Sequence, residues 1–240
     1  RRAEILEAAQ PLTLVQRSHA TASQSTYLNE YDGKLILQAG GIAIPAGRLV
    51  TAENAEIAAD EIGYPLVLKM VSAKLAHKTE AGAVKLNLQS AQAVSAAIAS
   101  MQQAVLEYDP AAVTDQFLLE PMVPGVITEL MVSIRHDEQF GLAMTLASGG
   151  IFIELIADAV TLLLPTSEQE ILTALGKLKV AKLLDGFRGK PAVDKQMLVA
   201  ELIKLAEFMA TKVDEIAEVE INPLFVCEDG VCAIDVLLNR

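Results

Sequence analysis

The sequence predicts a mixed α/β fold of two lobes joined by a hinge. Short apolar segments such as residues 65–71 alternate with longer segments of helical spacing such as residues 90–109. Near the middle of the chain, Pro121, Pro124 and Gly125 interrupt this pattern. With 52% hydrophobic and 21% charged residues, the composition is that of a globular protein. Two such lobes favour a nucleotide held in the cleft between them.

The N-terminal residues 1–26 differ in composition from the rest of the chain. They include the small, polar segment "RSHATASQST" and predict a tail or an interdomain linker. Because the chain begins with Arg1 rather than with methionine, we expect it to be part of a longer protein. No signal-peptide pattern follows this start.

The first lobe is expected over residues 27–115, with helices and strands in alternation. Thr51 and Ser90 stand where side-chain caps begin helices, and Gly63 stands where a helix ends. The expected elements are a helix over 29–41, a strand over 42–50, a helix over 51–63, strands over 65–71 and 83–89, and a helix over 90–109.

The second lobe is expected over residues 116–240. Its most apolar stretch, residues 141–164, is broken by a Gly-Gly pair and by two acidic residues, so it predicts buried strands rather than a membrane span. The expected elements are strands over 116–123, 127–135, 141–147 and 160–165, helices over 167–177 and 192–212, and a C-terminal hairpin.

Charge and aromatic content exclude some classes of partner. The formal net charge is −12, aromatic residues make up 4%, and tryptophan is absent, so we expect no nucleic-acid partner. We expect no membrane partner either. A negatively charged protein can still bind ATP where its lysines and arginines cluster locally and a metal ion shares the charge.

The C-terminal hairpin predicts a metal site. Asp229 and Gly230 lie between two apolar runs and form a two-residue turn signal. A turn there places Asp235 opposite Leu224. In that register Asn222 and Asp235 are diagonal neighbours, about 7–8 Å apart on one face.

Three oxygen-bearing side chains share this face of the hairpin, namely Glu220, Asn222 and Asp235. Carboxylate and amide oxygens are the ligands that Mg²⁺ uses in proteins, so the three are candidate metal ligands. The alternative is an ordinary solvated face. The same register places Cys227 across from Cys232; two cysteines are too few for a disulfide scaffold, and we expect reduced thiols and a cytoplasmic protein.

The segment from residue 61 to residue 86 predicts a phosphate site. Lys69 lies in an apolar run, and His77 and Lys78 follow eight positions later, ahead of small residues around Gly82. A neutral imidazole is a competent nucleophile near physiological pH, so His77 can accept a phosphoryl group. The alternative is a surface loop with a histidine of no special role.

Several motifs together carry a resemblance to a known family. They are "GYPLVLKMVSAKLAHKTEAGAVKL", "LLEPMVPGVITELMVSIRHDEQFG", "SGGIFIEL", "LLDGFRG", "EIAEVEINPLFV" and "AIDV". In this order, over about residues 28–240, the chain resembles the ATP-grasp domain of ADP-forming (NDP-forming) acyl-CoA synthetases, whose superfamily includes succinyl-CoA synthetase. It also looks like the equivalent domain of bacterial protein lysine acetyltransferases.

The resemblance implies a nucleotide site between the lobes of an ATP-grasp fold. At matching positions, Lys69 would contact the nucleotide phosphates, and Glu120 with the backbone around Met122 would meet the adenine edge. Glu129 would hold the ribose hydroxyls. Arg188 would reach a phosphate or form a structural salt bridge. The alternative for Lys69 is a lysine at a strand edge whose ammonium group reaches solvent. The alternative for Glu120 and Glu129 is that both are plain surface carboxylates.

The resemblance also implies a metal and a catalytic residue. Glu220, Asn222 and Asp235 match the magnesium-binding group, in agreement with the hairpin geometry. His77 resembles the histidine that receives a phosphoryl group near the nucleotide. Lysines and Mg²⁺ would supply the positive charge that phosphoryl transfer needs.

The implied reaction is acyl-CoA + ADP + phosphate in exchange with carboxylate + CoA + ATP. The implied cofactors are ATP or ADP and Mg²⁺, with CoA bound by another domain. The CoA-binding and ligase domains would belong to the same or a partner chain, in a possible oligomer, and the fragment alone would be incomplete. The alternatives are a synthetase-like regulatory domain of a protein lysine acetyltransferase and a non-catalytic interaction module.

Overall fold

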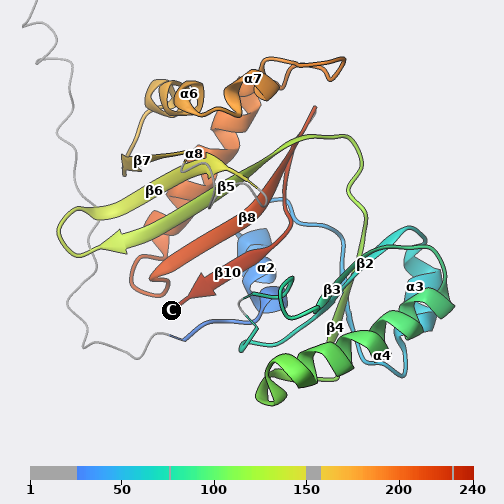
Figure 1. Cartoon of the computed structure of the whole chain (residues 1–240). Coiled ribbons are helices and arrows are strands. Elements are labelled where there is room, and N and C mark those ends of the chain that lie inside the picture. Colours follow the sequence, from blue (N-terminus) through green and yellow to red (C-terminus); the bar gives the residue numbers. More distant parts are fainter. Residues whose placement is uncertain (1–25, 76, 150–157, 229) are drawn as a thin grey trace, which may run out of the picture.

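The computed structural model describes residues 26–75, 77–149, 158–228 and 230–240. Its strands form two antiparallel sheets, one of four strands in the order β1-β4-β2-β3 and one of six in the order β10-β8-β5-β6-β7, with β9 paired to β8 (Figure 1). The predicted mixed α/β fold is therefore confirmed. The tail or linker predicted over residues 1–26 lies outside the described residues, apart from Thr26.

The small sheet and its helices form one hydrophobic core. The long helix α4 begins at the predicted cap, because the Ser90 side chain accepts a hydrogen bond from the Ala93 N–H. The elements are β1 (Arg48–Val50), α3 (Ala55–Ile62), β2 (Leu66–Met70), β3 (Val84–Leu88), α4 (Ala91–Tyr108), the 3₁₀ turn η1 (Pro110–Ala112) and β4 (Phe117–Pro121). In α4, Val94, Ile98, Met101 and Val105 recur at helical spacing and are buried in this core.

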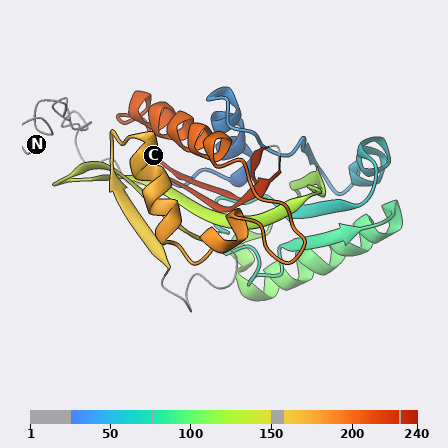
Figure 2. The same ribbon diagram turned by 90° about the horizontal axis from the view of Figure 1, so that it is seen from above.

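The large sheet forms the second core together with buried residues of four helices among the described residues. The elements are α2 (Glu30–Ala39), β5 (Val126–Asp137), β6 (Gly141–Ser148), β7 (Ala159–Leu163), α6 (Glu168–Lys177), α7 (Ala181–Leu184), α8 (Lys195–Thr211), β8 (Glu218–Cys227), β9 (Val231–Ala233) and β10 (Val236–Asn239). Figure 2 shows α6 and α8 lying over the large sheet, whereas α4 lies beside the small sheet at the other end of the molecule. No helix of the described part of the chain is long and apolar enough to cross a membrane.

The connection between the sheets differs from the predicted lobe boundary. β4 pairs with β1 and β2, so it belongs to the small sheet, although the second lobe was expected to start at residue 116. The chain crosses to the large sheet over residues 122–125, where the prolines and Gly125 predicted a hinge. Helix α2 comes before the small sheet in sequence but packs on the large one: Gly33 lies against β10, where an added Cβ would be 3.3 Å from Val236 Cγ1.

Two predicted elements of the first lobe are shorter in the structure. The strand expected over 42–50 is limited to β1, and the helix expected to begin after Thr51 begins after Asn54 instead. The reason is local: the Asn54 side chain accepts a hydrogen bond from the Thr51 N–H, which closes a turn over residues 51–54 before the helix.

The register predicted for the C-terminal hairpin is wrong by two residues. Leu224 faces Ala233 rather than Asp235, and the Asn222 N–H donates to the Asp235 carbonyl at 3.0 Å, so Asn222 and Asp235 are directly opposite. The turn lies one residue earlier than predicted, because the Cys227 N–H donates to the Gly230 carbonyl. A shift of two residues keeps every side chain on its predicted face.

The corrected register also separates the two cysteines. Cys232 pairs with Phe225, not with Cys227, and neither cysteine forms a disulfide, in agreement with the predicted reduced thiols. Burial raises the pKa of the Cys232 thiol to about 11, so this thiol stays protonated at neutral pH.

Candidate nucleotide and metal site

Six charged side chains gather where α2 and the two sheets meet, and we call them the lysine–carboxylate cluster. They are Glu30 and Lys34 of α2, Lys69 of β2, Lys78 of the loop over residues 71–83, Glu120 of β4, and Asp235 between β9 and β10. Five of the side chains are at most 7% exposed, and Asp235 is 29% exposed. Charged groups are buried to this degree only where they are paired.

Lys69 connects the two sheets. Its Nζ lies 2.5 Å from Glu30 Oε1 and 3.2 Å from Glu120 Oε2, and it donates to the Ile234 carbonyl of the large sheet at 2.5 Å. Burial alone lowers the pKa of a lysine, but the carboxylates of Glu30, Glu120 and Asp235 outweigh this and hold the pKa of Lys69 well above its usual value. Lys69 is therefore a fixed positive charge at the junction.

Glu30 and Lys34 come from the first turns of α2. The Asn29 side chain caps this helix by accepting a hydrogen bond from the Asp32 N–H, which fixes the direction of the first turn. Glu30 and Lys34 pair at 2.9 Å with one helical turn between them, and Lys34 also donates to Glu120 at 2.5 Å. Although burial raises the pKa of Glu30, the surrounding lysines hold it far below its usual range.

Lys78 joins the loop that carries His77 to the predicted metal ligand Asp235. The Lys78 Nζ lies 2.8 Å from Asp235 Oδ1 and 3.3 Å from Glu30 Oε2. Burial and the negative charge of Glu30 raise the pKa of Asp235, and Lys78 and Lys69 act in the opposite direction. The raised pKa of Asp235 therefore comes first from burial and then from Glu30, despite the contact with Lys78.

The predicted metal ligands share one region of the hairpin. Asn222 and Asp235 are opposite each other, and burial together with the charges of Glu218 and Asp235 raises the pKa of Glu220. Among the described residues, no three His, Cys, Asp or Glu side chains are grouped closely enough to hold a metal ion by themselves. Mg²⁺ needs only one or two protein carboxylates and completes its shell with other oxygens.

His77 is exposed at the same junction. Its carbonyl accepts a hydrogen bond from the Ala81 N–H at 3.2 Å, which folds the loop into a turn directly before Lys78. The charge of His77 acts to lower the pKa of Glu220, so the imidazole lies within electrostatic range of the hairpin. The structure thus brings His77, Glu220 and Asp235 into one region.

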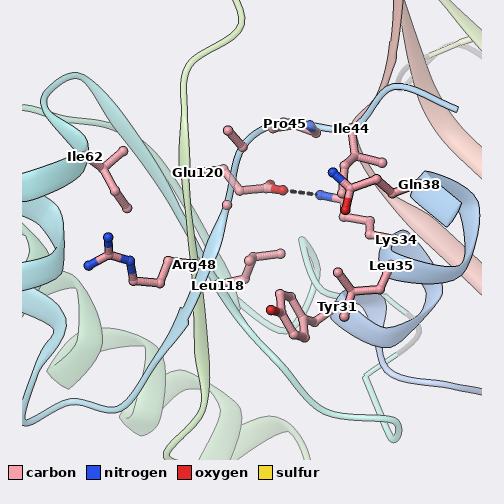
Figure 3. Close-up of a pocket in the computed structure, with 12 residues that line it drawn as sticks. Tyr31, Lys34, Leu35, Gln38, Ile44, Pro45, Arg48, Ile62, Leu118 and Glu120 are labelled. Atoms are coloured by element: carbon pink, nitrogen blue, oxygen red, sulfur yellow. Dashed lines mark hydrogen bonds and ion pairs between the residues drawn. The ribbon is translucent and has the colours of Figure 1, made fainter. Parts of the chain in front are cut away.

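A pocket of about 350 Å³ lies beside the Lys34–Glu120 ion pair (Figure 3). Its size is in the range of small-molecule sites, and its wall combines apolar side chains with charged and polar ones. The lining residues are Tyr31, Lys34, Leu35, Gln38, Ile44, Pro45, Ala46, Gly47, Arg48, Ile62, Leu118 and Glu120. At Gly47 a side chain would not fit, because an added Cβ would be 2.9 Å from both Glu120 Cγ and Leu118 Cδ1.

Comparison with known proteins shows the family. Residues 19–239 match the ATP-grasp domain family. The chain belongs to the ATP-grasp family. It is 31% identical over 215 residues to the beta subunit of ADP-forming acetate–CoA ligase II from Pyrococcus furiosus, a match that covers 89% of this chain and 90% of that subunit.

Two solved structures of an ATP-grasp relative are similar over most of the chain. The dinucleotide-forming acetyl-coenzyme A synthetase 1 of Ca. Korarchaeum cryptofilum, in complex with coenzyme A, Ca-AMPCP and HgCl⁺, has a TM-score of 0.81 at 33% identity and covers 89% of this chain and 93% of that chain. The structure of the same synthetase in complex with coenzyme A and Mg-AMPPCP has a TM-score of 0.73 at 31% identity and covers 89% of this chain and 92% of that chain. In that structure the phosphohistidine segment points towards the nucleotide binding site. The predicted ATP-grasp fold and the likeness to ADP-forming acyl-CoA synthetases are confirmed.

Two of the predicted nucleotide ligands of the ATP-grasp site lie at the hinge. Glu120 is 2% exposed and bound to Lys34 and Lys69. Met122 is 37% exposed, and its N–H donates to the Pro65 carbonyl at 3.2 Å, so this amide is engaged within the small lobe. Glu120 lines the pocket, and Met122 follows it by two residues.

Glu129 and Arg188 lie apart from the lysine–carboxylate cluster. Glu129 is half-buried on β5, opposite Phe225 of β8, and Arg188 is exposed, with its guanidinium 5.2 Å from the centre of the Phe187 ring. The loop of Arg188 is held against the start of β5, because Lys190 donates to the Val126 and Ile127 carbonyls at 3.0 Å each. The pocket is lined by other residues.

Glu30 and Lys34 are not marked as site residues by any motif in the sequence. An acidic residue followed four positions later by a lysine is the usual pattern of an exposed ion pair on a helix. The signal that distinguishes this pair is burial, since α2 packs with both residues facing the junction. Burial of this kind depends on contacts with β4 and β2, which are distant in the sequence.

Proposed function

We propose that this chain is the nucleotide-binding, beta-subunit-type component of an ADP-forming acyl-CoA synthetase. The reaction is acyl-CoA + ADP + phosphate in exchange with carboxylate + CoA + ATP. The observation that carries the proposal is the lysine–carboxylate cluster, which joins both lobes beside a pocket of small-molecule size. The similar Pyrococcus subunit, named an acetate–CoA ligase and matched over nearly its whole length, supports it and makes acetate the first acyl group to test.

The nucleotide binds along the junction in this proposal. Its phosphates meet Lys69 and Lys34, and its base packs against the apolar side chains of the pocket next to Glu120 and Met122. An ammonium group on a flexible stem suits phosphate, and an apolar wall suits a purine ring. Two further contacts are predictions from the family resemblance: Glu129 contacts the ribose, and Arg188 contacts a phosphate.

Glu220, Asn222 and Asp235 hold Mg²⁺ in this proposal. When bound, the metal ion neutralises the phosphate charge that builds up during phosphoryl transfer. The cluster itself contains three lysines and three carboxylates, so it offers a polyanion no net attraction. The Mg²⁺ bound by Glu220, Asn222 and Asp235 would thus provide the additional positive charge that attracts the phosphates.

His77 receives and passes on the phosphoryl group. A ring nitrogen attacks the phosphorus of a phosphorylated donor, so that a P–N bond forms on His77 as the donor's bond to phosphorus breaks. The ADP terminal oxygen then attacks the same phosphorus, the P–N bond breaks, and ATP forms with neutral His77 restored. The exposed position of His77 at the junction favours this role, and the similar synthetase, whose phosphohistidine segment points towards its nucleotide site, supports it.

The partners follow from the chemistry. CoA and the acyl group are handled by domains on the same or a partner chain, and the partial reaction here is nucleotide binding. The similar proteins named above are a ligase and a synthetase, which favours this function over a regulatory part of a lysine acetyltransferase or a non-catalytic module. The reduced state of Cys227 and Cys232 supports the proposed cytoplasmic location.

Isothermal titration calorimetry with ADP tests this function. We expect the chain to bind ADP in the presence of Mg²⁺, and we expect Asn222→Ala to weaken binding at least about tenfold, because one metal ligand is lost. Gln139→Ala is the control, since this amide is exposed in the β5–β6 hairpin. An absence of heat with the unaltered chain, or equal affinity in the two variants, contradicts the proposal.

A further inference from the structure

The ammonium group of Lys78 occupies the position next to Asp235 that a metal ion would need. Its Nζ is 2.8 Å from Asp235 Oδ1, and the side chain is 7% exposed. The second contact of Lys78 is Glu30 Oε2 at 3.3 Å, a buried oxygen that accepts no hydrogen bond from any described residue. Lys78 is thus held by charge on both sides.

The charge balance of the cluster makes it unfavourable for Asp235 to bind Lys78 and a divalent cation at the same time. Glu30, Glu120 and Asp235 carry three negative charges, and the three lysines of the cluster carry three positive ones. A divalent cation on Asp235 would add two positive charges within a few ångströms of the Lys78 ammonium. Repulsion between like charges is strong at such distances in a partly buried site, because solvent screens it poorly.

We propose that Lys78 and a divalent cation compete for Asp235, so that binding of the cation releases Lys78 and detaches the turn over residues 77–83, which carries His77, from the large sheet. This rests on the proposed function, in which Asp235 is a metal ligand. The released ammonium becomes available to a nucleotide phosphate, whose negative charge compensates the cation. The cation and the nucleotide therefore assist each other's binding, and Lys78 sets the size of that coupling.

Lys78 attaches the His77 turn to Asp235 and α2, whereas Leu75, Ala81 and Ala83 anchor the loop in the small-sheet core. Its backbone is closed on itself, since the Gly82 N–H donates to the Thr79 carbonyl at 3.1 Å and the Ala83 N–H to the Lys78 carbonyl at 2.8 Å. Across the junction, Lys78 links this turn to Asp235 and to Glu30 of α2. Loss of these two contacts detaches the exposed His77 turn from Asp235 and α2, while its internal bonds and the packing of Ala81 and Ala83 in the small-sheet core remain.

Binding of Mn²⁺ alone, measured by electron paramagnetic resonance, tests the competition. We expect Lys78→Met to bind Mn²⁺ about tenfold more tightly than the unaltered chain, within the usual range of coupling between sites. The control Lys74→Met removes the same charge from an exposed position of the same loop and is expected to change the affinity less than about twofold. We also expect ADP to increase Mn²⁺ affinity by a smaller factor in Lys78→Met than in the unaltered chain. Equal affinity in the two variants, or weaker binding by Lys78→Met, overturns the inference.

Reductive methylation of the unaltered chain gives a second measurement that does not depend on the folding of a variant. Mass spectrometry should show Lys78 methylated at least about fivefold faster with saturating Mn²⁺ than without it, and Lys74 methylated at the same rate in both. An unchanged Lys78 rate in the Mn²⁺-bound protein overturns the competition but leaves the proposed function standing. If Mn²⁺ does not bind even with ADP, or if Asp235→Asn binds it equally well, the metal site of the proposed function fails, and the inference fails with it.

Discussion

At the scale of single residues, Glu30 holds the lysines of the junction in place. It lies 2.5 Å from Lys69, 2.9 Å from Lys34 and 3.3 Å from Lys78, all of them buried. Removal of one partner from a buried ionic group leaves the other charges without compensation, which costs more than the group contributes as a pair. Glu30 is therefore expected to matter for stability as well as for the site.

We predict that Glu30→Gln lowers the free energy of unfolding by about 3 kcal/mol at pH 7. The loss should be smaller at pH 10. Burial lowers the pKa of a lysine, and the negative charge of Glu30 opposes this effect at Lys69 and Lys78. Without that charge the two pKa values fall, so these lysines can lose their protons at pH 10. Urea unfolding at the two pH values measures this, with the exposed Glu207→Gln expected within about 0.5 kcal/mol of the unaltered chain. An equal loss at both pH values would argue against a charge effect.

The unaltered chain has its own pH dependence. The pKa of Glu30 is held below the unfolded value, so its contribution is present above about pH 4.5 and is lost as the pH falls further. The pKa values of Lys69 and Lys78 are raised, so their contribution is complete below about pH 10.5 and is lost at higher pH. Asp235, whose pKa is raised, acts against Glu30 in acid.

At the scale of elements, β6 ends at a close approach to β5. The Gly149 N–H donates to the Glu129 carbonyl at 2.9 Å, and a Cβ on Gly149 would lie 2.8 Å from backbone atoms of Glu129 and Leu130. Only glycine permits this approach without a backbone shift. The predicted ribose ligand Glu129 thus depends on a glycine of the next strand.

We predict opposite effects for two glycine substitutions. Gly149→Ala should lower the free energy of unfolding by about 1–3 kcal/mol, because the new methyl group must push β6 away from β5. Gly176→Ala in α6, where an added Cβ meets nothing within 4 Å, should raise it by about 0.5–1 kcal/mol through helix propensity. Urea unfolding of both variants measures the difference, and a loss of equal size in both would contradict the close approach.

The elements could largely be predicted, and their errors are local. Helix α4 begins after Ser90, as the capping pattern indicated. Helix α3 begins after Asn54 rather than after Thr51, because the Asn54 side chain closes a turn that helical spacing does not reveal. The hairpin register failed because Asp229-Gly230 is a strong turn signal, but the Cys227–Gly230 hydrogen bond moves the turn by one residue. The prediction that Asn222 and Asp235 share one face is still correct, because strand side chains alternate with a period of two and the register error is two residues.

At the scale of the whole molecule, the site exists only where the two sheets meet. Lys69 comes from the small sheet, Asp235 from the large one, and Glu30 from a helix packed on the large sheet. The candidate residues Lys69, Glu120, Asn222 and Asp235 could be found from motifs, but the burial of Glu30 and Lys34 could not. It depends on sheet order, with β4 between β1 and β2, which local sequence does not encode.

Hydrogen–deuterium exchange with and without Mg²⁺ and ADP tests the central claim that one nucleotide site spans both lobes. We predict slower exchange in residues 44–48 beside the pocket and in residues 233–236 of the large lobe, with no change in α6. Slower exchange confined to one lobe, or none in either, would contradict the account.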